Sequence, residues 1–122
     1  MDLNQISGLI INCAIEVHRN LGPGLLEKIY ENALCIELIK KELRFDQQKI
    51  ISVLYKEHKI GEHILDLLVE NTVVVEIKSA EQDNPLFQAQ LLSYMKLGNY
   101  KLGLLINFNK KLLKNGIKRM IL

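Results

Sequence analysis

The spacing of apolar residues divides the chain into stretches with a helical period and stretches with a strand period. The predicted helices are residues 3–20, about 25–43 and 86–97. Gly22-Pro23-Gly24 ends the first helix, and Asn84-Pro85 starts the third. Alternating or continuous short apolar runs predict the strands. They are residues 49–55, about 59–69, 72–79, 102–108 and about 117–122.

The order of these elements predicts an α/β (α+β) fold, with a mixed β-sheet flanked by helices on both faces. One helix, residues 86–97, connects the third strand to the fourth, so we expect these two strands to be parallel and their connection right-handed. The run Val73-Val74-Val75 indicates that the third strand is central and covered on both faces. We expect residues 1–122 to form one domain, because 122 residues can enclose one core but not two.

Three charged residues lie within the apolar hairpin formed by the second and third predicted strands. They are Asp66, Glu76 and Lys78. Ionised side chains are costly among Val, Leu and Ile unless a partner compensates them. Glu76 and Lys78 project from one face of their strand, because side chains alternate with a period of two. On a solvated face the same spacing would be only a surface ion pair of little value.

The register of this hairpin decides whether Asp66 joins Glu76. A two-residue loop at Glu70-Asn71 would place Asp66 opposite Val75 and separate the carboxylates. A three-residue loop, residues 70–72, with Asn71 or its neighbour in the left-handed region, places Asp66 directly across from Glu76. We favour the second register.

Two opposed carboxylates would lie with their Cβ atoms about 4.5 to 5.5 Å apart and would repel each other unless a cation lay between them. No Cys or His accompanies the pair, so Mg²⁺ or Mn²⁺ fits better than zinc. Lys78 could hold a nucleophilic water or neutralise charge on a phosphate. The distance of His58 and His63 from the acids along the chain argues against a histidine site.

Two helices carry further candidates. Glu27 lies in the first turn of the second helix, where the helix dipole is the ordinary explanation for a carboxylate. It also lies one turn before Tyr30, so both are expected on the face that meets the core, within reach of the hairpin acids. Gln90 and Tyr94 share one face of the third helix, where Tyr94 would ordinarily be part of the core.

The composition is that of an ordinary globular protein, 48% hydrophobic and 25% charged with a net charge of +2. This small net charge does not indicate an overall electrostatic field that would attract nucleic acid. Residues 101–119, however, contain several basic residues and no acidic one, and they form either a binding patch or a solvated face. Cys13 and Cys35 lie in apolar helical patterns typical of buried reduced thiols. With no signal peptide and no apolar run long enough for a membrane span, we expect a cytoplasmic protein.

Five segments together resemble the GxxExxY protein family, a branch of the PD-(D/E)XK nuclease superfamily. They are Glu16 to Tyr30, Asp66-Leu-Leu-Val, Glu76-Ile-Lys78, Ala89-Gln90-Leu-Leu-Ser-Tyr94 and Leu102 to Asn109. The similarity extends from about Ile6 to Leu122, with the motifs in the family's order. It implies a restriction-endonuclease-like core. Where relatives usually have His-Glu before Ala-Gln, this chain has Phe87-Gln88.

The resemblance also implies roles for individual residues. The implied metal ligands are Asp66, Glu76, the backbone carbonyl of Ile77, and Glu27 as an additional acid. Lys78 corresponds to the catalytic lysine, and Gln90 with Tyr94 resembles the Gln-x-x-x-Tyr element of RecB-like nucleases, which borders the site. The implied reaction is Mg²⁺- or Mn²⁺-dependent hydrolysis of phosphodiester bonds, with DNA as the expected substrate.

Two other functions stay open at this point. The modest charge and the lack of an appended recognition module also suit a catalytically silent module that binds nucleic acid or a protein partner. Hydrolysis of another phosphoester is a third possibility. If the apolar residues 117–122 form an edge strand, they could also pair with a second copy of the chain in a homodimer.

Overall fold

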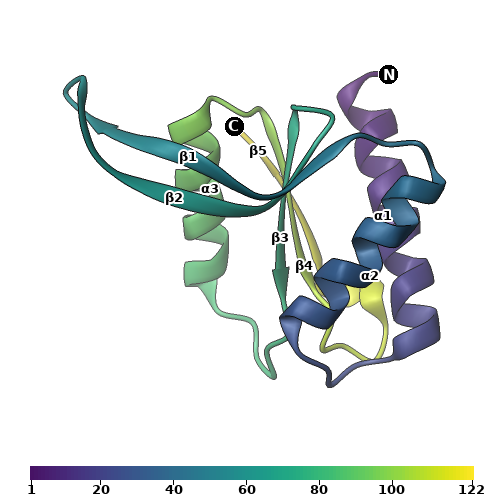
Figure 1. Cartoon of the computed structure of the whole chain (residues 1–122). Coiled ribbons are helices and arrows are strands. Elements are labelled where there is room, and N and C mark those ends of the chain that lie inside the picture. Colours follow the sequence, from purple (N-terminus) through teal and green to yellow (C-terminus); the bar gives the residue numbers. More distant parts are fainter.

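A five-stranded mixed sheet forms the centre of the protein, with α1 and α2 on one side and α3 on the other (Figure 1). The computed structural model describes all residues, Met1–Leu122. The helices are α1 (Leu3–Leu21), α2 (Glu27–Lys40), α3 (Pro85–Gly98) and the short 3₁₀ helix η1 (Leu113–Gly116). The strands are β1 (Phe45–Tyr55), β2 (His58–Val69), β3 (Val73–Lys78), β4 (Leu102–Asn107) and β5 (Ile117–Ile121).

The strands lie in the order β1-β2-β3-β4-β5, and only β3 and β4 are parallel. This confirms the predicted mixed sheet and the predicted parallel pairing of the two strands that helix α3 connects. Val73, Val74 and Val75 are fully buried, as expected for a central strand covered on both faces. No helix is long and apolar enough to cross a membrane.

Two hydrophobic clusters hold the helices against the sheet. The larger joins α1 and α2 to one face through buried residues such as Ile10, Tyr30, Val75 and Ile77. The smaller joins α3 to the other face. Its buried members are Ile51, Leu65, Leu68, Val74, Leu91, Met95 and Leu105. Burial of apolar area on both faces stabilises the sheet and fixes its strand order.

Tyr30 fixes the turn between α1 and α2. Its hydroxyl donates a 2.6 Å hydrogen bond to the Gly22 carbonyl and accepts one of 3.1 Å from the Leu25 backbone N–H. Its ring stacks on Phe108 with the ring centroids 4.5 Å apart. Gly22 has φ +70° and Gly24 φ +97°, values that glycine adopts without the steric cost of a Cβ. The start of α2 is therefore held in one place.

Two predicted boundaries are wrong. α2 ends at Lys40 rather than near residue 43, because Glu42 adopts φ +58° and the Leu43 N–H bonds back to the Leu38 carbonyl. This turn directs Leu43 into the core. β1 begins four residues before the predicted start, because residues 45–47 already pair with residues 67–69 of β2.

Candidate active site

The register of the β2–β3 hairpin brings Asp66 and Glu76 together. Val69 pairs with Val73, and Leu67 with Val75. Residues 70–72 form the turn, in which Glu70 has φ +52° and Asn71 φ +57°. This confirms the three-residue loop. Continuing the register by one residue places Asp66 across from Glu76.

At these two acids, backbone N–H groups donate to carboxylate oxygens of the opposite strand. The Ile77 backbone N–H donates to Asp66 Oδ2 at 2.9 Å, and the Asp66 N–H donates to Glu76 Oε1 at 3.4 Å. Each carboxylate is therefore bonded to the opposite strand through one of its oxygens. Strand pairing thus orients both carboxylates.

Glu76 is the buried member of the pair, with 7% of its surface exposed. Burial first, and the charge of Asp66 second, raise the pKa of Glu76 to about 8, while the charge of Lys78 opposes the shift. The pair therefore favours holding a proton at neutral pH when no cation is present. A divalent cation would offset the repulsion between the two carboxylates, which is the second cause of this shift.

Lys78 lies two residues beyond Glu76 on the same strand, half-buried. Its Nζ is 4.7 Å from the centroid of the Phe87 ring on α3, a cation–π distance. Phe87 is one of the two residues at which the sequence differs from the motif of the GxxExxY proteins that it resembles, and its aromatic ring lies against the lysine. Phe87 and Asn107 also line a pocket of about 210 Å³ beside Lys78.

Asn107 organises the segment that follows Lys78. It is the register partner of Lys78 in β4 and is buried. Its side chain accepts from the Ala80 N–H at 3.1 Å and donates to the Ala80 carbonyl at 3.0 Å and to Asp83 Oδ1 at 3.2 Å. The only sequence signal for this role is an amide at the end of a very apolar strand.

On α3, Tyr94 lies near the acid pair. Its ring stacks on His63, with the centroids 3.7 Å apart. Burial, and then the charges of Glu76 and Asp66, raise the pKa of Tyr94. Although His63 is separated from the acids along the chain, burial lowers its pKa and the charge of Asp66 opposes this shift. No group of three or more Asp, Glu, His or Cys side chains forms here, so the prediction against a histidine site is not contradicted. Gln90 lies one turn before Tyr94 and is partly exposed.

The acid that α2 buries is Glu31, and the expectation that Glu27 faces the core is wrong. Glu31, 3% exposed, accepts from Lys28 Nζ at 2.8 Å, Gln47 Nε2 at 2.6 Å and Gln48 Nε2 at 2.9 Å. Glu27 is exposed at the start of the helix. Sequence analysis missed Glu31 and Lys28, because period alone does not show which turn of a helix is covered.

The start of α2 is nevertheless attached to the end of β3. The hydroxyl of Ser79, the residue after Lys78, donates a hydrogen bond to the carbonyl of Leu25, which lies two residues before Glu27. The hydrogen bond that Lys28 donates to Glu31 is the main cause that raises the pKa of Lys28, and the charge of Asp66 adds to it. The first turn of α2 therefore borders the acid pair.

The chain is similar to a known nuclease superfamily. The family model of the PD-(D/E)XK nuclease superfamily matches residues 4–120. The chain belongs to this superfamily. Asp66 and Glu76-Ile77-Lys78 have the residue types and the order of the D and the (D/E)XK in the superfamily name, with Leu65 rather than proline before the aspartate. No curated protein and no solved structure gives a significant match.

PD-(D/E)XK nucleases generally depend on divalent metals, so we tested whether these residues suit one. No group of three or more Asp, Glu, His or Cys side chains meets here, so the acid pair is not joined by a third such side chain. Mg²⁺ commonly uses one or two carboxylates and retains several waters. Two oxygen-donor groups, one of them with a raised pKa caused partly by repulsion, fit such an ion.

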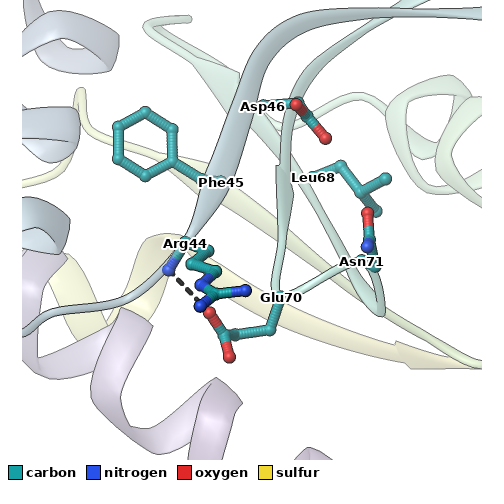
Figure 2. Close-up of a pocket in the computed structure, with 6 residues that line it drawn as sticks. All are labelled: Arg44, Phe45, Asp46, Leu68, Glu70 and Asn71. Carbon is teal, nitrogen blue, oxygen red and sulfur yellow. Dashed lines mark hydrogen bonds between the residues drawn. The ribbon is translucent and has the colours of Figure 1, made fainter.

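Figure 2 shows a separate pocket of about 310 Å³ near the β2–β3 turn. It is lined by Arg44, Phe45, Asp46, Leu68, Glu70 and Asn71. Glu70 accepts a 2.6 Å hydrogen bond from the Arg44 backbone N–H. In Figure 2 the Asp46 carboxylate lies on the Leu68 side, apart from Glu70. Because Asp66, Glu76 and Lys78 do not line this pocket, its acids are distinct from the PD-(D/E)XK residues.

Proposed function

We propose that the chain is a Mg²⁺- or Mn²⁺-dependent nuclease that hydrolyses phosphodiester bonds of DNA. The observation that supports this most is the exchange of hydrogen bonds between the Asp66 and Glu76 segments, which fixes two carboxylates beside Lys78. Superfamily membership makes nucleic acid the expected substrate.

The proposed mechanism assigns the metal to Asp66, Glu76 and the carbonyl of Ile77. Glu27, which is exposed at the start of α2 and does not join the acid pair, is not assigned as a ligand. When bound, the ion lowers the pKa of a water and stabilises charge on the phosphate. Lys78 holds the attacking water or helps to remove its proton. Gln90 and Tyr94 border the site from α3 and contact the substrate phosphate.

We also place the chain in the GxxExxY branch. This placement is supported by the hydrogen bonds of Tyr30 to Gly22 and to Leu25, the residue after Gly24, which hold the turn between α1 and α2. Both cysteines are free and buried, which agrees with the expected cytoplasmic location. The likeness to RecB-like nucleases rests on Gln90 and Tyr94.

The test is degradation of plasmid and single-stranded DNA with Mg²⁺ or Mn²⁺, using Asp66→Asn, Glu76→Gln and Lys78→Met. We expect each variant to lose at least about 100-fold in rate. Glu62→Gln is the matched control on β2, because Glu62 forms only an exposed ion pair with Lys59. This variant should cleave DNA at the wild-type rate. Circular dichroism checks that every variant is folded.

A catalytically silent binding module is the competing function. It predicts that wild type binds DNA equally well in EDTA and cleaves nothing at any metal concentration. Wild-type cleavage that survives all three substitutions would instead contradict the assigned site. Cleavage only of small phosphodiesters would move the substrate to another phosphoester.

We further propose that the protein forms a homodimer through β5. This strand pairs only with β4, so its outer edge is free, and Ile121 is 66% exposed. Open strand edges can pair with a second copy. Light scattering should give twice the chain mass for wild type and a monomer for Ile121→Lys. A wild-type monomer at high concentration would contradict this.

A further inference from the structure

His63 lies on the α3 face of the sheet although regular alternation would separate it from Asp66. Leu65 and Leu68 are three residues apart, yet both belong to the cluster under α3. Alternation is therefore broken between them. The break coincides with Gln48, which has φ +57° and lies between the Gln47–Leu67 and Lys49–Leu65 pairs without a register partner of its own. As a result His63 and Asp66 both face α3.

The His63 ring has two structural properties that belong together. It stacks on Tyr94 with an angle of 25° between the ring planes. Its Nε2 is buried without a hydrogen-bond partner. An unpartnered buried nitrogen costs free energy, so hydrogen bonding does not explain the place of this ring. The contact that it does make is the stack on Tyr94.

We propose that His63 is a positioning residue that holds the Tyr94 ring, and hence its hydroxyl, over the acid pair. The inference rests on the nuclease function proposed above and extends it. Tyr94 is on α3, whereas Asp66 is on β2. The stack joins the tyrosine directly to the strand that carries the aspartate, so the hydroxyl keeps a fixed relation to the carboxylates.

A fixed hydroxyl matters because small displacements of a group that contacts the reacting phosphate lower the rate strongly. A tyrosine on a helix can otherwise adopt other side-chain rotamers. His63 restricts this choice from one side, and the α3 core cluster, against which Tyr94 packs, restricts it from the other. The ring plane of His63, rather than its nitrogen, is the feature that acts.

The test is a double-mutant cycle between His63→Ala and Tyr94→Phe, measured as kcat and KM for DNA cleavage at saturating Mn²⁺. We expect His63→Ala to lower kcat by about 10-fold, with KM changed by less than about 2-fold. In the Tyr94→Phe background the hydroxyl is already absent, so His63→Ala should cost almost nothing more. His63→Phe keeps an aromatic ring and should restore most of the rate.

The control is Tyr100→Ala, which removes another aromatic ring that packs against the same cluster. Its effect should be equal in the Tyr94 and Tyr94→Phe backgrounds, because it does not act through the hydroxyl. Thermal melts check folding, and His63→Leu replaces His63→Ala if the smaller side chain unfolds the protein.

The outcomes separate the two proposals. Equal loss from His63→Ala in both backgrounds, or no loss at all, overturns the positioning role while wild-type cleavage upholds the nuclease. Failure of His63→Phe to restore the rate in a folded protein also overturns it. Wild type that cleaves nothing overturns the nuclease, and the positioning role with it.

Discussion

The backbone N–H of Ile77 donates a 2.9 Å hydrogen bond to the Asp66 carboxylate on the neighbouring strand. This bond makes the orientation of a site carboxylate a direct result of strand pairing. It also fixes the backbone of Ile77, the residue between Glu76 and Lys78. The acid pair is therefore as rigid as the centre of the sheet, and its chemistry can be tested through stability as well as through cleavage.

The metal-free protein should lose stability as pH rises. The pKa of Glu76 is about 8 in the folded protein and near the ordinary value of 4.5 for a glutamate when unfolded. The folded state therefore binds more protons at Glu76 between these values, so the contribution of Glu76 to stability is fully present below pH 4.5 and is lost as pH rises through 8. We expect a loss on the order of a few kcal/mol, measured by urea unfolding in EDTA.

Glu76→Gln supplies the control for this pH effect. The amide does not titrate, so the variant should show a flatter dependence and should be more stable than wild type at pH 8.5, where Glu76 is ionised. Parallel curves for the two proteins would show that other groups cause the dependence.

Divalent metal should stabilise wild type through the acid pair. At 100 times its dissociation constant, Mn²⁺ should add about 2.7 kcal/mol to the free energy of unfolding. Asp66→Asn combined with Glu76→Gln should abolish this gain, and Glu62→Gln should retain it. Calorimetric titration at several pH values should also show protons released on binding and tighter binding as pH rises, because the ion requires the ionised Glu76. An equal gain in the double variant would refute the metal site.

Glu31 should matter more for stability than a half-buried acid of the same helix, Glu37. Glu31→Ala removes the buried acceptor of the Gln47 and Gln48 amides, so we expect a loss of about 1–3 kcal/mol in urea unfolding. Gln47 retains its bond to Asn32, and the largely exposed Lys28 can bind water instead. Glu37→Ala is the matched control, because Glu37 also pairs with a lysine three residues away, Lys40, at 3.8 Å. It should cost at most about 1 kcal/mol. Similar losses in both variants would deny Glu31 a special role.

Removing the Tyr30 hydroxyl should loosen the start of α2. Tyr30→Phe keeps the stack on Phe108 but loses the hydrogen bonds to Gly22 and Leu25, at a cost of about 1–2 kcal/mol. Hydrogen exchange should speed up over residues 22–30 in particular. Tyr55→Phe, at an exposed position, should change neither quantity. Unchanged exchange in Tyr30→Phe would show that the stack alone holds this turn.

Some features of the site follow from local sequence. The polar turn between the two apolar runs predicts the register that opposes Asp66 and Glu76, because a shift of one residue would move every side chain to the other face. The central place of β3 is equally local, since only a strand covered on both faces tolerates three consecutive valines. The assignment of Glu27 to the core failed, because burial on α2 depends on which turn the sheet covers.

The sequence by itself determined the element types, the parallel pair around α3, and the acids and lysine of the hairpin, because period, turn length and charge act over a few residues. Only the tertiary structure decided that Glu31 is the buried acid of α2, that Phe87 lies against Lys78, and that His63 stacks on Tyr94. Each of these depends on how a helix docks on the sheet. The irregular pairing at Gln48 that turns His63 toward α3 likewise depends on contacts between residues far apart in the chain.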